Sequence, residues 1–197
     1  FENAAMQITG NFGGPSTDKP LVIENCIFNK SVVNIQGGYA VVVKGCTFDL
    51  TLTDAHDGES FYAIRMQAIP TTVDNCTFKN NNATANGSAY TGYGGAVSIN
   101  GSNTVIKNST FIENSAIGND VDYTGYGGAI EVTGSNTQIL DSKFINNSAT
   151  ATEGGPEFTG FGGAVSITGR NTLVSNSNFT DNSADYGGAI TYHKERH

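Results

Sequence analysis

The strongest constraint on this chain is a short stretch of sequence that it repeats. The clearest copy covers residues 94–116, which begin with Gly94-Gly95-Ala96 and end with an asparagine, a serine and an alanine. Copies with nearly the same sequence begin 33 residues later, at Gly127, and a further 35 residues later, at Gly162. A repeat of this period is typical of a solenoid, in which each repeat forms one coil and stacks on the coil before it. The repeat therefore constrains the fold far more than any single residue does.

Two short apolar elements recur in the repeats. The first alternates apolar and polar residues, and its seven copies begin at Ala5, Val32, Ala63, Ala96, Ala129, Ala164 and Ala189. The second ends in a phenylalanine, namely Phe28, Phe48, Phe78, Phe111, Phe144 or Phe179. Both elements are rich in β-branched residues and are bounded by glycine, asparagine, serine or aspartate, which predicts strands. No apolar stripe with the period of a helix persists along the chain.

Identical residue types recur once per repeat, as they do when every coil stacks in register on the last. This pattern predicts an all-β, right-handed parallel β-helix of about six to seven coils, with residues 1–197 forming a single domain that is part of a longer protein. Alternation along a strand places apolar residues in the core and the residues between them in solvent. We therefore expect six residues of the first element to face solvent: Gln7, Asn34, Arg65, Ser98, Glu131 and Ser166.

A column of small residues lies two positions before the phenylalanines. It holds Cys26, Cys46 and Cys76, and serine takes the place of cysteine in the later repeats. We expect buried free thiols. A disulfide between neighbouring coils is the alternative, since a strand spacing of roughly 4.8 Å lies within the range of a bridge, but side chains stacked in parallel point the same way.

Three positions after the phenylalanines lies a second polar column. Its members are Ser31, Thr51, Asn81, Asn114, Asn147 and Asn182. Asparagine tolerates left-handed backbone and its amide can hydrogen-bond along a stack, so we expect an asparagine ladder at a corner of each coil. Among the Asn-x-Ser/Thr sequences, Asn82 and Asn86 are the better candidates for glycosylation.

The candidate binding residues are aromatic and lie where the coils carry inserted loops. Three loops end alike and contribute two aromatic residues each: Tyr90, Tyr93, Tyr123, Tyr126, Phe158 and Phe161. Stacked coils would align them in columns. Either the rings pack on each other and hold the loops in place, or they form an exposed ribbon that contacts sugar rings or a protein partner. The second alternative makes these six residues the predicted ligand-binding site.

Neither a metal site nor a catalytic site is predicted, and no cofactor is expected. Acidic residues gather in the same loops, at Asp54, Asp57, Glu59, Asp120, Asp122, Glu153 and Glu157, where we expect a solvated rim rather than a calcium site. The only candidate catalytic constellation is Arg65 with Asp54, His56 and Asp57. The histidines near the end, His193 and His197, are interpreted as part of a tail. We therefore expect a protein that is not an enzyme.

The bulk properties exclude two classes of partner. A formal net charge of −8 disfavours binding to nucleic acid, which requires a basic surface. No apolar run approaches the roughly 18 residues of a membrane-spanning helix, so this segment is not expected to insert into a membrane. The remaining partners are protein or glycan ligands and the flanking coils of the same polypeptide.

The paired motifs Gly-Gly-Ala-Ile/Val and Phe-x-x-Asn resemble the repeat of the polymorphic outer-membrane protein family. The wording is also similar to adhesin-like surface proteins of methanogenic archaea that carry pectate-lyase-like β-helix regions. The match is strongest from Asn75 to Ile190 and weaker in the first two coils. The resemblance implies an extracellular, cell-surface adhesin that binds another cell surface. The alternatives are a structural stalk or, further from the pattern, a polysaccharide lyase or hydrolase.

Overall fold

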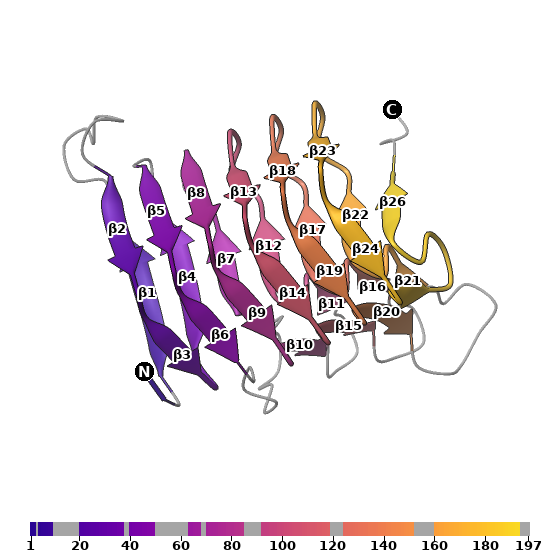
Figure 1. The fold of residues 1–197 in the computed structure, drawn as a ribbon, viewed down its shortest axis with the longest axis horizontal. Helices are drawn as coiled ribbons and strands as arrows, with labels where there is room; N and C mark the ends of the chain where they lie inside the picture. Colours follow the sequence, from indigo (N-terminus) through magenta and orange to yellow (C-terminus); the bar gives the residue numbers. More distant parts are fainter. Residues whose placement is uncertain are drawn as a thin grey trace.

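The computed structural model describes residues 1–2, 4–9, 20–37, 40–49, 63–67, 70–84, 92–118, 124–151 and 160–193. Throughout these residues the regular elements are short strands, and neighbouring coils pair through parallel strands. Figure 1 shows the coils side by side along the long axis, from the indigo N-terminal coil to the yellow C-terminal one. The predicted all-β parallel β-helix is confirmed. Within the described ranges there is no helix that could span a membrane.

Three sheets run along the solenoid. The long sheet has seven strands, β1 (Ala5–Thr9), β4 (Val32–Gln36), β7 (Ile64–Met66), β12 (Val97–Ile99), β17 (Ile130–Val132), β22 (Val165–Ile167) and β26 (Ile190–Tyr192). The second sheet has six, β2 (Leu21–Glu24), β5 (Val41–Lys44), β8 (Thr71–Asp74), β13 (Val105–Lys107), β18 (Gln138–Leu140) and β23 (Leu173–Ser175). The phenylalanine sheet also has six, β3 (Ile27–Asn29), β6 (Thr47–Asp49), β9 (Thr77–Lys79), β14 (Thr110–Ile112), β19 (Lys143–Ile145) and β24 (Asn178–Thr180).

Two smaller sheets belong to the later coils, on the side where the loops are inserted. The corner sheet consists of β10 (Asn82–Thr84), β15 (Ser115–Gly118), β20 (Ser148–Ala151) and β25 (Ser183–Ala184). The short sheet consists of β11 (Gly92–Tyr93), β16 (Gly125–Tyr126) and β21 (Gly160–Phe161), and Tyr186 continues it through a parallel bridge to Phe161. In Figure 1 both small sheets lie toward the C-terminal half of the solenoid. This side of the coil therefore differs from the other three.

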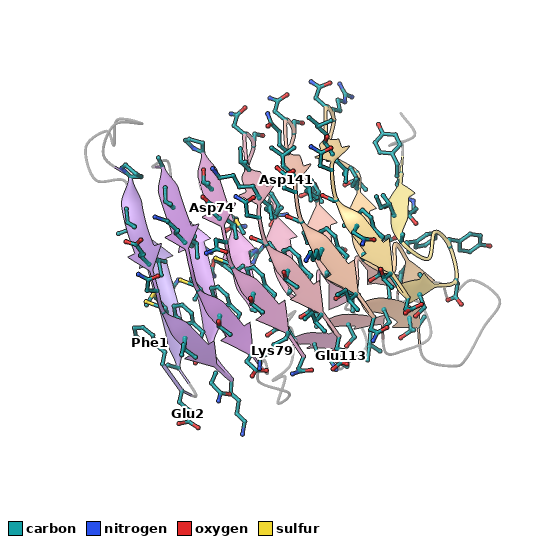
Figure 2. All side chains as sticks on the ribbon, in the orientation of Figure 1. Phe1, Glu2, Asp74, Lys79, Glu113 and Asp141 are labelled. Atoms are coloured by element: carbon teal, nitrogen blue, oxygen red, sulfur yellow. The ribbon has the colours of Figure 1, made fainter. Side chains whose placement is uncertain are left out.

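The core contains a stack of phenylalanine rings, which we call the inner phenylalanine ladder. Its members are Phe28, Phe48, Phe78, Phe111, Phe144 and Phe179. Successive ring centroids lie 4.7 to 4.8 Å apart, with interplanar angles of 8° or less. Phe1 stacks on Phe28 at 5.1 Å and lies at the N-terminal end of the solenoid (Figure 2). Five of the six ladder rings are at most 1% exposed, so the ladder forms the centre of the core.

The cysteines and serines in the column beside this ladder are linked by a chain of hydrogen bonds. The Cys46 amide donates to the Cys76 sulfur at 3.4 Å, and the Cys76 amide donates to the Ser109 hydroxyl at 3.2 Å. All three thiols are free, and Cys46 and Cys76 are buried as predicted, whereas Cys26 is half-buried. Cysteine and serine alternate here because either side chain can accept the amide of the preceding coil.

The asparagine ladder is also confirmed. The Asn114 side-chain amide donates to the Asn147 side-chain oxygen at 2.9 Å and to the Phe78 carbonyl at 3.1 Å. The same bonds recur at Asn81 and Asn147, and Ser31 accepts the Ala4 amide at the corresponding place in the first coil. Thr51 lies outside the described residues. These bonds tie each coil to both of its neighbours.

One detail of that prediction is wrong, because the ladder asparagines are not the left-handed residues. The left-handed residue is the one before each ladder position, with φ between 48° and 55°: Lys30 precedes Ser31, and Asn80, Glu113, Asn146 and Asp181 precede the asparagines. The preceding residue makes the sharp corner. The ladder residue then keeps ordinary backbone, so that its amide points along the stack.

The outward face of the long sheet also departs from the prediction. Gln7 is exposed, and Asn34 and Arg65 are half-buried, but Ser98, Glu131 and Ser166 are only 4%, 5% and 1% exposed. The reason is the short sheet, whose strands enter glycine turns that pack directly against β12, β17 and β22. In these coils both faces of the long sheet are therefore covered.

Candidate functional site

Three of the six predicted binding residues lie in the short sheet. Tyr93, Tyr126 and Phe161 occupy the same position in β11, β16 and β21, and Tyr186 follows them in the next coil. Their rings stack at centroid distances of 5.7, 5.5 and 5.3 Å, with interplanar angles of 9°, 12° and 20°. We call these four residues the outer aromatic ladder. Tyr90, Tyr123 and Phe158 lie outside the described residues.

The repeated glycines position this ladder. Gly94, Gly127 and Gly162, each directly after a ladder residue, have left-handed backbone with φ of 54°, 63° and 66°. A Cβ atom on any of them would collide with the carbonyl oxygen of the strand that follows, such as that of Val97. Only glycine allows both the conformation and the close approach. The turn therefore brings the backbone beside each ladder residue into contact with the long sheet.

The ladder is partly open to solvent. Tyr93 is 39% and Tyr186 is 57% exposed, whereas Tyr126 and Phe161 are half-buried. Rings that stack on one another cover each other's faces, so Tyr126 and Phe161 present their edges outward. Burial raises the pKa of Tyr126, and a hydrogen bond with Thr124 opposes that effect. Stacking and exposure thus coexist, although the sequence had suggested them as alternatives.

His193 packs against the ladder from the end of β26. Its ring lies edge-on to Phe161 at 4.4 Å and to Tyr126 at 5.7 Å, with interplanar angles of 82° and 80°. Its Nε2 atom is buried without a hydrogen-bond partner, and burial lowers the pKa of the imidazole. The interpretation of His193 as tail was wrong. The signal that could have found it is register, because it follows the seventh copy of the first strand element.

Beneath the ladder lies a polar floor, formed by Ser98, Glu131 and Ser166 in register on β12, β17 and β22. The Ser98 hydroxyl donates to Glu131 Oε2 at 3.2 Å. The Ser166 hydroxyl is buried without a partner. Burial raises the pKa of Glu131 to about 7, while the Ser98 hydrogen bond and the charge of Arg65 act in the opposite direction. The sequence did not predict this floor, because it placed these residues in solvent.

A polar column borders the ladder on the same face of the long sheet. It contains Asn100, Thr133 and Thr168, and His193 continues it. The backbone amides of all four residues donate to equivalent carbonyl groups of the preceding coil. Asn100 donates to the Thr133 hydroxyl at 2.8 Å and accepts from Arg65 Nε at 3.4 Å. The hydroxyl and amide groups of this polar column therefore lie beside the ring edges of the outer aromatic ladder.

The other predicted sites fall largely outside the described part of the chain. Asp54, His56 and Asp57, the companions of Arg65 in the candidate catalytic constellation, are not among the described residues. The same is true of the acidic loop residues Glu59, Asp120, Asp122, Glu153 and Glu157. Among the described residues no three or more histidine, cysteine or acidic side chains are grouped so that they could hold a metal ion.

Comparison with known proteins supports the resemblance drawn from the repeat. Residues 108–133 match the family model of the Chlamydia polymorphic membrane protein repeat. This segment begins directly after β13 and contains β14, β15, β16 and β17, so it covers most of one coil, including Tyr126 and Glu131. Comparison with curated proteins and with solved structures found no match. The chain therefore carries the repeat of the polymorphic outer-membrane protein family, within a parallel β-helix.

Proposed function

We propose that this chain is an extracellular, non-catalytic segment of a cell-surface adhesin, which binds a glycan or protein ligand along the outer aromatic ladder. The polymorphic membrane protein repeat and the β-solenoid fit a surface-displayed, adhesin-like protein. The observation that carries the binding role is the position of Tyr93, Tyr126, Phe161 and Tyr186 in one continuous stack on the outer flank, where two of them are more than a third exposed.

The chemistry of the flank suits a carbohydrate or a polar protein strand. The ring edges offer apolar contact, and Asn100, Thr133 and Thr168 offer hydrogen-bond donors and acceptors a short distance away. Tyrosine is favoured at such interfaces because it supplies a large rigid contact area and a polar group. In the later coils the ladder repeats once per coil, so we expect an extended ligand with repeating units to bind more tightly than a short one.

A structural stalk is the second candidate function. The observation that favours it is that the ladder rings stack on one another, which covers the faces that sugar rings would use. In that case the outer ladder holds the loops against the solenoid, and binding belongs to another part of the protein.

The test is a screen of the chain on arrays of glycans and of extracellular proteins, beside the double variant Tyr93→Ala/Tyr126→Ala. The matched control is Tyr192→Ala, since Tyr192 is 61% exposed and lies outside the ladder. Binding that disappears in the double variant and persists in the control supports the proposal. Binding that persists in the double variant contradicts it. If the wild type binds nothing on either array, the result favours the structural stalk.

A further inference from the structure

Glu131 is the one carboxyl group on the floor of the outer aromatic ladder, and the turn above it lies very close. A Cβ atom on Gly127 would be 3.0 Å from the Glu131 amide nitrogen. Tyr126, the residue before that turn, is near enough for the charge of Glu131 to influence its pKa. Glu131 is 5% exposed, so the ladder and its turns shield it from water.

An ionised carboxylate in this position lacks hydrogen bonds. It can accept about four hydrogen bonds, but the described residues supply one, from Ser98 at 3.2 Å. Ser166 is the in-register neighbour on the other side, and its hydroxyl is buried without a partner. Even if that hydroxyl turned to donate, half of the capacity of the carboxylate would stay unfilled. Burying a charge with unfilled capacity is costly.

The surrounding charged and titratable groups do little to offset that cost. On the sheet side, Arg65 stands two strands away, roughly 9 to 10 Å along the stack, and it also bonds to Asn100. On the ladder side are Tyr93 and Tyr126, and burial raises the pKa of the Tyr126 hydroxyl, so it carries no charge near pH 7. His193 packs on Tyr126, and burial lowers its pKa, so it too is uncharged at and above neutral pH. Among the described groups around Glu131, therefore, only Arg65 carries a positive charge.

We infer that Glu131 is a proton-dependent latch, which keeps Tyr126 packed over the floor while the carboxyl group is protonated and lets the ring move away when the carboxyl group ionises. The neutral acid is compatible with the dry floor, and its O–H group can donate to the unpartnered Ser166 hydroxyl. On ionisation the proton passes to solvent, and water reaches the carboxylate where the Tyr126 ring had been. The latch concerns the packing of the ladder and holds whether or not the ladder binds a ligand.

The experiment follows the rings of the chain by NMR, with ring-¹³C-labelled tyrosine and Tyr126→Phe to assign the Tyr126 signal. A neutral gadolinium chelate reports how accessible each ring is to solvent. Between pH 5.5 and 8.5 we expect the accessibility of Tyr126 to rise several-fold, with a midpoint near pH 7. Glu131→Gln should keep the accessibility of Tyr126 at its low-pH value throughout. Ser98→Ala removes the donor that favours the charged form, so it should move the midpoint to higher pH.

The control is Glu113→Gln, because Glu113 is an exposed glutamate at a corner of the same solenoid (Figure 2) and its loss should leave the transition unchanged. Tyr192 is exposed and lies away from the floor, so the accessibility of its ring should not change with pH. If the Tyr126 resonance shifts with pH while its accessibility stays constant, the carboxyl group titrates without moving the ring and the latch is overturned. An unaltered transition in Glu131→Gln overturns it as well.

Discussion

The two aromatic ladders of this molecule both repeat once per coil, but they differ in geometry, and the outer one belongs to the later coils alone among the described residues. In the inner phenylalanine ladder the rings lie 4.7 to 4.8 Å apart, which matches the spacing of paired strands. In the outer aromatic ladder the spacing is 5.3 to 5.7 Å and the rings are tilted by up to 20°. Core atoms surround the inner rings, so the spacing of these rings equals the spacing of the paired strands. The outer rings have solvent on one side, so their spacing can exceed that of the strands.

Composition follows the same division. All six inner positions are phenylalanine, because a tyrosine hydroxyl buried there would need a partner that an apolar core does not offer. The outer positions are tyrosine, tyrosine, phenylalanine and tyrosine, and the hydroxyl groups can reach water or neighbouring side chains. The inner ladder therefore belongs to the core, and the outer ladder is the surface at which we propose binding.

The largest expected effect is from Phe111→Ala, which removes a ring packed between Phe78 and Phe144. Phe111 is fully buried, and the parallel strands on both sides limit how far the gap can close. We expect the free energy of unfolding to fall by about 3 to 5 kcal/mol. Guanidinium chloride unfolding followed by circular dichroism measures it. A loss below about 1 kcal/mol would mean that the inner ladder is not the main source of stability.

The next effect depends on pH and comes from the floor of the outer ladder. The unfolded chain releases the Glu131 proton near pH 4.5, whereas the folded chain keeps it until about pH 7. Stability is therefore highest below pH 4.5 as far as this group is concerned, and it falls as pH rises from 4.5 to 7. We expect wild type to lose up to about 3 kcal/mol relative to Glu131→Gln across this window.

Unfolding curves of both proteins at a series of pH values test this. The difference between wild type and variant is the quantity of interest, because the other carboxyl groups contribute to both curves alike. A difference that stays constant between pH 4.5 and 7 would show that Glu131 does not hold its proton in the folded chain. Movement of Tyr126 on ionisation would make the loss smaller than about 3 kcal/mol, since water would then solvate the carboxylate.

A smaller effect on stability is expected from Tyr126→Ala in the outer ladder. The ring is half-buried and stacks on Tyr93 and Phe161, so we expect a loss of about 1 to 2 kcal/mol. Removing the ring also admits water to the floor, so the pKa of Glu131 should fall toward its ordinary value. Unfolding at pH 5.5 measures the first effect, and a carboxyl-labelled NMR titration measures the second. A loss as large as that of Phe111→Ala would contradict the division between the ladders.

The sequence predicted the inner half of this comparison much better than the outer half. Alternation and the recurring Phe111, Asn114 and Cys76 columns each depend on neighbours one coil away, so the period alone places them. The period also places Glu131 and His193 in register, but it does not reveal their surroundings, because these come from the short sheet, which crosses the outer face after an inserted loop. Alternation indicates which face a residue occupies but not whether another segment covers that face.

The smallest effect is expected in the column beside the inner ladder, for Cys76→Ser. The Cys76 sulfur accepts the Cys46 amide at 3.4 Å and donates to the Asp74 carbonyl at 3.4 Å, and Ser109 accepts the Cys76 amide in the same way. A serine at position 76 can make both bonds, so we expect a change no larger than the net value of one hydrogen bond, about 1 kcal/mol. Cys76→Ala leaves the buried Cys46 amide without an acceptor and should cost about 1 to 3 kcal/mol. Equal stability of the two variants would mean that packing, rather than the hydrogen bonds along the stack, holds this column together, and the core would then depend on its rings alone.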